Sequence, residues 1–541
     1  MELKKSLLKS GLVLSLMTLF SRIMGLIREG TKAHFMGTSS YADAFTIAFM
    51  IPNLFRRLFA ENAISVAFIP TFRGYLEEEQ NDENKFKIQK FISSTLTLVS
   101  FLTAVVTVIG IIVTPFIIPF FLGDAQNGVI AEGTFLTRLM FPYLIVISVA
   151  AFFQGILNGV RVFAPSGFTP VIFNFCVIVF TFALTPFLPN PQGLPKEAMA
   201  ARAMAIGVLC GGCFQAIFQW PFVRKVGWKT TLTGLKAAFT NPGTRRVCAL
   251  IVPTIIGMAA YQLNDVVSTA IAGNIGPGTV SSLQYSLRLQ ELILGIFAVS
   301  IGTVILPDLS SLAKKENWQE FNDMLLQAIK IIALITIPVT FYSLVSGQEL
   351  ISLVYKRGSF DDESLHSTLE VFRFHIAGLY FIAVNRIISP AFYAQGNTKL
   401  PTAAGIISFV VNIGFAFLFS LPLSGGGIAL ALTAASLVNT VFLFVFMRKM
   451  NGMNAKQIAF KMIAFILKMM VFSVIAAVPA YFVRLFLVDC FGKYNWLVAY
   501  GVPVLATAFV FGAVGILLLV LSKDSVSVAL LAKVKGKVRR S

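Results

Sequence analysis

Long apolar runs separated by short polar loops recur along the whole chain of 541 residues. A helix of roughly 18 or more apolar residues is long enough to cross the hydrocarbon core of a bilayer, which is about 30 Å thick. Clear examples are Leu96–Phe121, Leu139–Leu157, Phe168–Leu188 and Trp496–Leu521. The pattern predicts an all-α polytopic membrane protein.

Counting these runs, and splitting the longest at Gly, Pro or charged residues, predicts about fourteen transmembrane helices. The loops between them are short, so we expect no soluble catalytic domain and a function carried out within the bilayer. The predicted spans are 8–33, 43–73, 86–121, 129–160, 165–188, 199–224, 246–274, 278–312, 321–347, 365–396, 400–421, 426–448, 455–487 and 494–522.

Positive charge is concentrated in alternate loops. When the N-terminus is placed in the cytoplasm, the cytoplasmic loops carry most of the Lys and Arg residues, with clusters at 73–90, 224–246, 448–456 and 523–540. This asymmetry follows the positive-inside rule, so both termini are predicted to be cytoplasmic. The net charge of +19 is therefore a topology signal and an attraction to anionic membrane lipids. We expect no nucleic-acid partner.

Two sequence segments recur in the second half of the chain. SVAFIPTFRGYLEEE (65–79) resembles GTVILPDLSSLAKKE (302–316), and GVRVFAPSGFTPVIFNF (159–175) resembles QGNTKLPTAAGIISFVVN (395–412). The aligned proline pairs, Pro70 with Pro307 and Pro165 with Pro401, have nearly the same offset. In the first pair, each proline is expected to end an apolar helix before a charged turn.

The repeat predicts two homologous six-helix lobes, 1–235 and 236–450, followed by two extra transmembrane helices within 451–522 and a basic cytoplasmic tail, 523–541. Because each lobe has an even number of helices, the lobes are parallel copies around a central cavity. This organisation is typical of transporters that work by alternating access, and fits a channel less well. We expect a monomer.

Several arginines fall inside predicted transmembrane helices, where each costs roughly 2.5–3.5 kcal/mol to insert. The planar guanidinium binds two oxygens at once, which suits a phosphate group. Together these residues predict a cavity for an anionic ligand, with the alternative that they pair with acids and only fix helix packing. The candidate ligand-binding residues are Arg22, Arg28, Arg56 and Arg288.

Other charges are candidates for balancing or gating this cavity. Arg57 and Glu61 are four residues apart and can form an ion pair along one helix. Glu291 follows Arg288 by three residues and can orient it, whereas Asp43 can balance Arg28 or close a gate.

Residues that would indicate enzymatic or metal chemistry are sparse. Cys210 and Cys213 form a C-x-x-C inside an apolar helix, which favours helix packing over metal or redox chemistry. The three histidines have no metal-ligand spacing. The adjacent acids Asp361 and Asp362 are interpreted as part of a solvated loop. We expect the protein not to be an enzyme.

Four stretches resemble the MurJ (MviN) family of bacterial lipid II flippases, part of the multidrug/oligosaccharidyl-lipid/polysaccharide exporter superfamily. They are SRIMGLIRE (21–29), ADAF (42–45), PNLFRRLFAENAISVAFIP (52–70) and YSLRLQELILGIFAVSIGTVILPDLS (285–310). The resemblance implies transfer of undecaprenyl-diphosphate-linked disaccharide-pentapeptide (lipid II) from the cytoplasmic to the periplasmic leaflet of the inner membrane. This step serves peptidoglycan synthesis, on which the cell wall and cell shape depend.

The resemblance also implies roles for individual residues. The essential cavity arginines of the family match Arg22, Arg28, Arg56 and Arg288, its essential aspartate matches Asp43, and the acid after the double arginine matches Glu61. The last two helices would guide the prenyl tail. Some members bind sodium in the second lobe, and the counterparts here would be Asp265, Asn412 and Thr433. No organic cofactor is expected, and sodium or the membrane potential would supply the energy.

Two alternatives remain open at this point. An exporter of another polyprenyl-diphosphate-linked oligosaccharide, of the O-antigen type, would need the same cationic cavity. An intramembrane enzyme acting on polyprenyl phosphate would instead need a metal-binding acidic pair or a His/Asp set at a loop edge.

Overall fold

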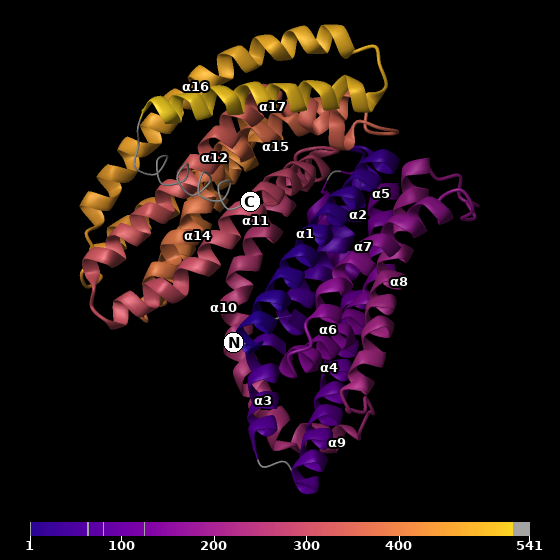
Figure 1. The fold of residues 1–541 in the computed structure, drawn as a ribbon. Coiled ribbons are helices and arrows are strands. Elements are labelled where there is room, and N and C mark those ends of the chain that lie inside the picture. The colour runs from indigo at the N-terminus through magenta and orange to yellow at the C-terminus, as the bar shows by residue number, and fades with distance from the viewer. Residues whose placement is uncertain (1, 62–63, 79–80, 124, 523–541) are drawn as a thin grey trace. The chain divides into compact units, whose positions relative to one another are not determined.

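The structure is a computed structural model, shown in Figure 1, and it describes residues 2–61, 64–78, 81–123 and 125–522. Within these ranges the side chains of 2–16, 59–61, 65, 252–261 and 296–304 lie outside the description. Every regular element of the described residues is a helix. The predicted all-α class is confirmed.

The helices follow the predicted spans closely in position along the chain. In order they are α1 (Glu2–Met36), α2 (Ser40–Phe55), the π-helices η1 (Arg56–Glu61) and η2 (Ile64–Phe68), α3 (Ile69–Glu77), α4 (Asp82–Leu122), α5 (Asn127–Met140), α6 (Tyr143–Gly159), α7 (Ala164–Leu184), α8 (Lys196–Lys225), α9 (Leu235–Thr240), α10 (Pro242–Gly273), α11 (Thr279–Lys314), α12 (Trp318–Tyr355), α13 (Asp362–Ala377), α14 (Leu379–Ala394), α15 (Lys399–Met447), α16 (Ala455–Phe491) and α17 (Trp496–Leu521).

The second predicted span is not one α-helix but a succession of α2, η1, η2 and α3. At the end of α2 the backbone N–H of Arg56 is shared between the carbonyls of Pro52 and Asn53. From Arg56 onward the backbone takes the wider i→i+5 hydrogen-bond pattern of a π-helix, which is common at functional sites. The double arginine therefore begins where the regular helix ends.

A second irregularity lies inside α15. The predicted spans 400–421 and 426–448 are two helical segments of α15 that fold back on each other at Ser424, where φ is 46° and ψ is −129°, and the Ser408 hydroxyl of the first donates to the Ala435 carbonyl oxygen of the second at 2.8 Å. Pro422, just before this reversal, lacks a backbone N–H. Gly427, just after it, approaches the chain so closely that a Cβ there would lie 2.1 Å from the Phe419 carbonyl oxygen. The break predicted between these two spans is therefore present, as a sharp reversal of the chain at Ser424.

Nine helical stretches of the described residues are long and apolar enough to cross a membrane. Two of them combine neighbouring helices, Asn127–Gly159 and Asp362–Ala394, and a third, Lys399–Met447, includes two predicted spans. The exact number of fourteen stays a prediction, with which these stretches are consistent.

The prolines of the repeat do not end helices as expected. Pro70 lies at the beginning of α3, and Pro307 lies inside α11, which continues to Lys314. A proline within a helix removes one hydrogen bond, and the chain resumes its helical path after it. The expectation that these two residues terminate their helices was wrong.

The chain divides into two compact units. Unit 1 contains Met1–Ser281 and Gly358–Phe360, and unit 2 contains Ser282–Arg357 and Asp361–Ser541. The predicted lobes were defined by internal sequence similarity, whereas these two units are defined by packing. The lobe boundaries therefore stay a prediction.

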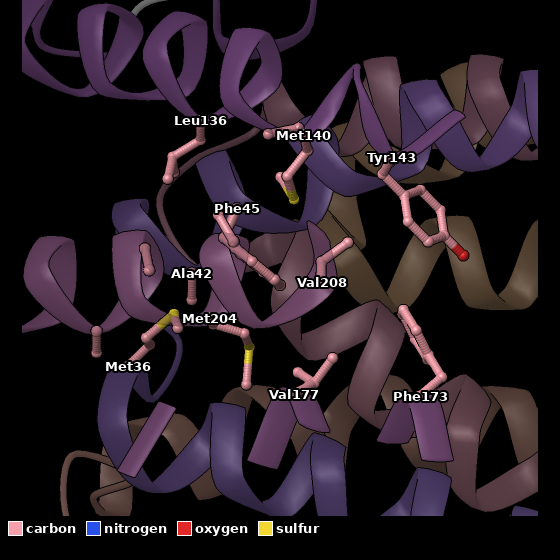
Figure 2. Packing of buried hydrophobic residues seen from close by; sticks show 14 of the residues in the cluster. Met36, Ala42, Phe45, Leu136, Met140, Tyr143, Phe173, Val177, Met204 and Val208 are labelled. Atoms are coloured by element: carbon pink, nitrogen blue, oxygen red, sulfur yellow. The ribbon is translucent and has the colours of Figure 1, made fainter. Parts of the chain in front are cut away.

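Unit 1 is built around helices α1, α2, α5, α6, α7 and α8, which contribute to one buried apolar cluster. Figure 2 shows side chains from all six helices gathered in this cluster, among them Phe45, Met140 and Val208. Between apolar helices in a membrane, close van der Waals packing is the main source of association. The cluster therefore fixes α1 and α2 relative to the helices behind them.

Glycines bring α7 and α8 especially close together. A Cβ at Gly207 would lie 3.0 Å from the Cα of Val177, and one at Gly211 would lie 3.2 Å from the Phe173 carbonyl oxygen. The two glycines form a small-xxx-small motif, which lets helix backbones approach in membranes. This contact fixes the position of α7, whose Asn174 faces α1.

In unit 2, α16 and α17 lie side by side and both pack on α12. The Arg484 Nε donates to Glu349 at 2.8 Å, and Glu349 is buried. The Tyr342 hydroxyl donates to the Val504 carbonyl oxygen at 2.7 Å. These contacts link each of the two extra helices to α12 through a polar group as well as through apolar packing.

The C-terminal end of α1 is capped by a distant loop within unit 1. The carbonyls of the last helical turn have no partner inside a helix. Gly37 N–H donates to Ala33 and Ser39 N–H to Met36, while the two carbonyls between them are bound by Ser359. Ser359 N–H lies 2.8 Å from the His34 oxygen, and its hydroxyl lies 3.2 Å from the Phe35 oxygen.

The neighbouring Gly358 makes this capping possible. Its φ is +60°, and a Cβ there would lie 2.2 Å from the His34 carbonyl oxygen.

We predict that Gly358→Ala lowers the melting temperature of the purified protein more than Gly193→Ala does. Both replacements place Ala at a positive φ, at a cost of about 1–2 kcal/mol. Gly193, with φ +63°, has open space around it.

The clash with His34 should add about 1–3 kcal/mol to the Gly358→Ala variant alone. Equal melting temperatures for the two variants would show that the loop tip does not support α1.

Candidate functional site

Three charged side chains lie together on α1. Arg28 Nη2 is 2.7 Å from Glu29 Oε1, and Lys32 Nζ is 3.5 Å from Glu29 Oε2. The side chains of Glu29 and Lys32 are only 9 % and 5 % exposed. The Glu29 carboxylate is therefore shared by the two cations Arg28 and Lys32.

Arg28 is held in place by α7 and by aromatic rings. Its Nη1 donates to Asn174 Oδ1 at 3.1 Å, and Asn174 Nδ2 lies 3.4 Å from the Ser21 carbonyl oxygen. The guanidinium carbon lies 5.9 Å from the ring centre of Phe49 and 5.8 Å from that of Phe173, a cation–π distance. These contacts orient a partly exposed guanidinium before any ligand arrives.

The double arginine is divided between two environments. Arg56 Nε donates to Asn53 Oδ1 at 2.8 Å, within its own segment. Arg57 Nη1 lies 3.2 Å from Gln262 Oε1 and 3.8 Å from Asp265 Oδ2, both on α10. Because the Asp265 side chain is 58 % exposed, this ion pair contributes little to stability. The predicted Arg57–Glu61 pair involves the side chain of Glu61, which lies outside the described residues.

Asp43 completes the beginning of α11. Its carboxylate is buried and accepts three hydrogen bonds: Gly278 N–H at 2.7 Å, Ser281 N–H at 2.7 Å and the Ser281 hydroxyl at 2.5 Å. The first N–H groups of a helix lack internal partners and carry partial positive charge, so a carboxylate is well placed there. We call Asp43 with Gly278 and Ser281 the Asp43 latch.

Close packing around the latch is possible only with glycine at 278. Its φ is +81°, and a Cβ there would lie 2.2 Å from the Thr38 carbonyl oxygen. Two roles were open for Asp43 from the sequence, namely balancing Arg28 or closing a gate. The structure places its carboxylate on Gly278 and Ser281, and both roles stay predictions.

The remaining predicted arginines are less constrained by the described contacts. Arg22 lies half-buried on α1. Arg288 Nη1 pairs with Glu291 Oε2 at 2.8 Å, as the spacing predicted. The Arg288 side chain is 35 % exposed and the Glu291 side chain is 54 % exposed. Arg288 belongs to unit 2, so its convergence with the arginines of unit 1 stays a prediction.

The residues proposed for sodium have other contacts in the structure. The Asp265 carboxylate faces Arg57, and the Thr433 hydroxyl donates to the Phe374 carbonyl oxygen at 2.7 Å. Asn412 is buried on α15 in unit 2, whereas Asp265 lies in unit 1. The described residues contain no group of three or more His, Cys, Asp or Glu able to hold a metal. Sodium binding by Asp265, Asn412 and Thr433 stays a prediction.

The acidic pair considered for an intramembrane enzyme has structural contacts. Asp361 Oδ1 accepts the Ser364 N–H at 2.9 Å and caps α13, a bond that lowers the pKa of Asp361 below its usual value. Asp362 pairs with Lys356. Asp361 therefore stabilises a helix end, and Asp362 stabilises the loop before it. These contacts agree with the interpretation of the two acids as part of a solvated loop.

Sequence reasoning missed two members of the site. Neither Lys32, which is buried on α1, nor Asn174, which accepts a hydrogen bond from Arg28, was among the candidate residues. The i, i+3 spacing of Glu29 and Lys32 was a usable signal, because such residues are neighbours on a helix surface. The contact between Asn174 and Arg28 joins residues 146 positions apart and leaves no local pattern.

Sequence comparisons identify the relatives of this chain. The family model described as lipid II flippase MurJ matches residues 32–500. A probable lipid II flippase MurJ of Treponema pallidum is 47 % identical over 526 residues, which cover 97 % of each chain. A probable lipid II flippase MurJ of Vibrio cholerae is 32 % identical over 449 residues, covering 81 % of this chain and 82 % of the relative.

Solved structures extend the comparison to the fold. A lipid II flippase MurJ in an inward closed conformation superposes with a TM-score of 0.73 and 25 % identity, covering 93 % of this chain and 98 % of that one. An inward-facing multidrug resistance MATE family transporter of the MOP superfamily has a TM-score of 0.62 at 13 % identity, which shows likeness of fold alone. On the family match and on identities over nearly the full length, this chain belongs to the lipid II flippase MurJ family.

Proposed function

We propose that this protein moves lipid II from the cytoplasmic to the periplasmic leaflet of the bacterial inner membrane by alternating access. The family assignment supports the substrate. The observation that carries the proposal is the oriented Arg28, which Asn174, Glu29 and two aromatic rings hold inside an apolar helix bundle. A partly exposed, pre-oriented guanidinium is suited to a phosphate ligand.

The diphosphate would bind Arg28 and Arg56, with Arg22 and Arg288 completing the site. The Arg28 guanidinium is partly exposed, so it would be available for charge-assisted hydrogen bonds to an anionic ligand. The sugar-peptide head would occupy the hydrated interior while the prenyl chain remains in the lipid along α16 and α17. Both helices expose large apolar side chains, which suits contact with an acyl or prenyl chain.

Alternating access needs a contact that closes one side and can be broken. The Asp43 latch supplies a candidate, because it lies where α1 ends and α2 begins, the side that the loop charges assign to the periplasm. The bound ligand must favour one state over the other for the cycle to advance. A membrane potential, negative inside, provides about 2.3 kcal/mol per charge per 100 mV and would return the arginines inward after release. The chain would act as a monomer with both termini cytoplasmic.

We predict that Arg28→Ala and Arg56→Ala each reduce lipid II translocation by about tenfold or more, because each removes charge-assisted hydrogen bonds to the diphosphate. Complementation of a strain depleted of its own lipid II flippase, with a leaflet-accessibility assay, measures the effect. Arg246→Ala is the matched control, since Arg246 is an exposed arginine at the beginning of α10.

Normal export by the Arg28 and Arg56 variants would refute diphosphate docking. Complementation that fails with the unmodified chain, together with rescue of an O-antigen-type flippase mutant, would instead support a different lipid-linked oligosaccharide.

We predict that Asp43→Asn increases amide hydrogen exchange at Gly278 and Ser281 by about tenfold or more. The two carboxylate oxygens each accept one backbone N–H, and an amide offers a single acceptor oxygen and no charge. Exchange is measured by mass spectrometry of peptides covering 274–284. Asp82→Asn is the control, because the Asp82 side chain is fully exposed. Unchanged exchange in Asp43→Asn would show that the carboxylate does not hold the first turn of α11.

A further inference from the structure

Lys32 is a buried cation that the docking of a diphosphate does not use. It is 4 % exposed, and its Nζ lies 3.1 Å from the Thr46 hydroxyl oxygen on α2. That hydroxyl donates its own proton to the Ala42 carbonyl oxygen at 2.7 Å, so it accepts from the lysine. The second described partner is Glu29, which Lys32 shares with Arg28.

The resting position of Lys32 is one helical turn from the Asp43 latch. Thr46 follows Asp43 by three residues on α2, and residues three apart are neighbours on one helix face. An ammonium bound to Thr46 is therefore close to the Asp43 carboxylate, and the two charges attract each other. The flexible four-carbon stem of lysine allows the ammonium to move between these two groups without a change in backbone.

When the latch opens, the Asp43 carboxylate loses the hydrogen bonds that compensate its charge. In the closed form the carboxylate is satisfied by three hydrogen bonds from Gly278 and Ser281. Separation from α11 removes all three at once. A carboxylate that loses its hydrogen-bond donors in a poorly hydrated site is unfavourable, so a nearby cation would stabilise the open latch.

We propose that Lys32 is the alternative partner of Asp43: its ammonium leaves Thr46 and binds the carboxylate when the latch opens. Arg28 keeps Glu29, so in the open form the two cations of α1 pair one-to-one with the two carboxylates. Lys32 is thus a positioning residue that stabilises the open form of the latch. The inference rests on the proposed function only in that opening of the latch serves translocation.

The open fraction of the latch can be measured without any substrate. Val280 lies between Gly278 and Ser281 of the latch and is 1 % exposed. In a chain whose native cysteines are replaced by serine, Val280→Cys should react with a membrane-impermeant maleimide only while the latch is open. The labelling rate in reconstituted vesicles then reports the latch equilibrium.

Two substitutions at one contact should act in opposite directions. Lys32→Met should lower the labelling rate by about tenfold, because the open form loses its compensating cation. Thr46→Val should raise the rate, because it removes the resting partner of Lys32 and keeps the charge. Lys32→Arg should retain most of the wild-type rate. Lys330→Met is the matched control, since the ammonium of the half-buried Lys330 lies over the ring of Phe465 in unit 2.

A double-mutant cycle isolates the proposed pair. In an Asp43→Asn background the side chain at 43 is neutral, so Lys32→Met should no longer change the labelling rate. Persistence of the full Lys32→Met effect in that background would overturn the proposal.

Other outcomes would overturn it as directly. If Lys32 only holds α1 against α2, both Lys32→Met and Thr46→Val loosen the contact and raise the labelling rate. If water compensates Asp43 in the open form, Lys32→Met leaves the rate unchanged. Since labelling needs no lipid II, normal labelling behaviour without translocation would refute the proposed function and leave this inference standing.

Discussion

A charge removed from water inside a bundle of apolar helices must be compensated by another group, and this constraint shapes unit 1 of the protein. Glu29 accepts Arg28 and Lys32 on its two oxygens, and Asn174 orients the guanidinium from α7. The close α7–α8 contact at Gly207 and Gly211 holds Asn174 in register. The two glycines thus influence the position of the Arg28 guanidinium through helix packing, without contacting Arg28 themselves.

The backbone groups at helix ends that lack a partner within the helix must also be compensated. In this protein, segments distant in the sequence provide the hydrogen bonds. Ser359 binds the last free carbonyls of α1, and Asp43 binds the first N–H groups of α11. A cap supplied by another segment can be separated, whereas a cap within the helix cannot. Such caps therefore stabilise a closed arrangement without making it permanent, which is what a transporter that opens on alternate sides requires.

Sequence reasoning succeeded where the signal was local and periodic. Apolar runs located most helices to within a few residues, and the pairing of Arg288 with Glu291 followed from their spacing. It failed where backbone chemistry depends on neighbours: the α-helix expected over 43–73 changes to π-helix at Arg56, and Pro307 lies inside a helix that it was expected to end. Both departures depend on how the helix packs against its neighbours, which a single sequence does not show.

By itself, the sequence determined the class of fold and the kinds of side chain available, because membrane insertion restricts backbone and composition residue by residue. The motifs around Arg28, Asp43 and Arg56 also identified the family. Only the tertiary structure decided that Lys32 is buried beside Thr46 and that Asp43 holds the beginning of α11. These contacts join α1 to α2 and α2 to a turn more than two hundred residues away, and they depend on how the helices pack rather than on any pattern along the chain.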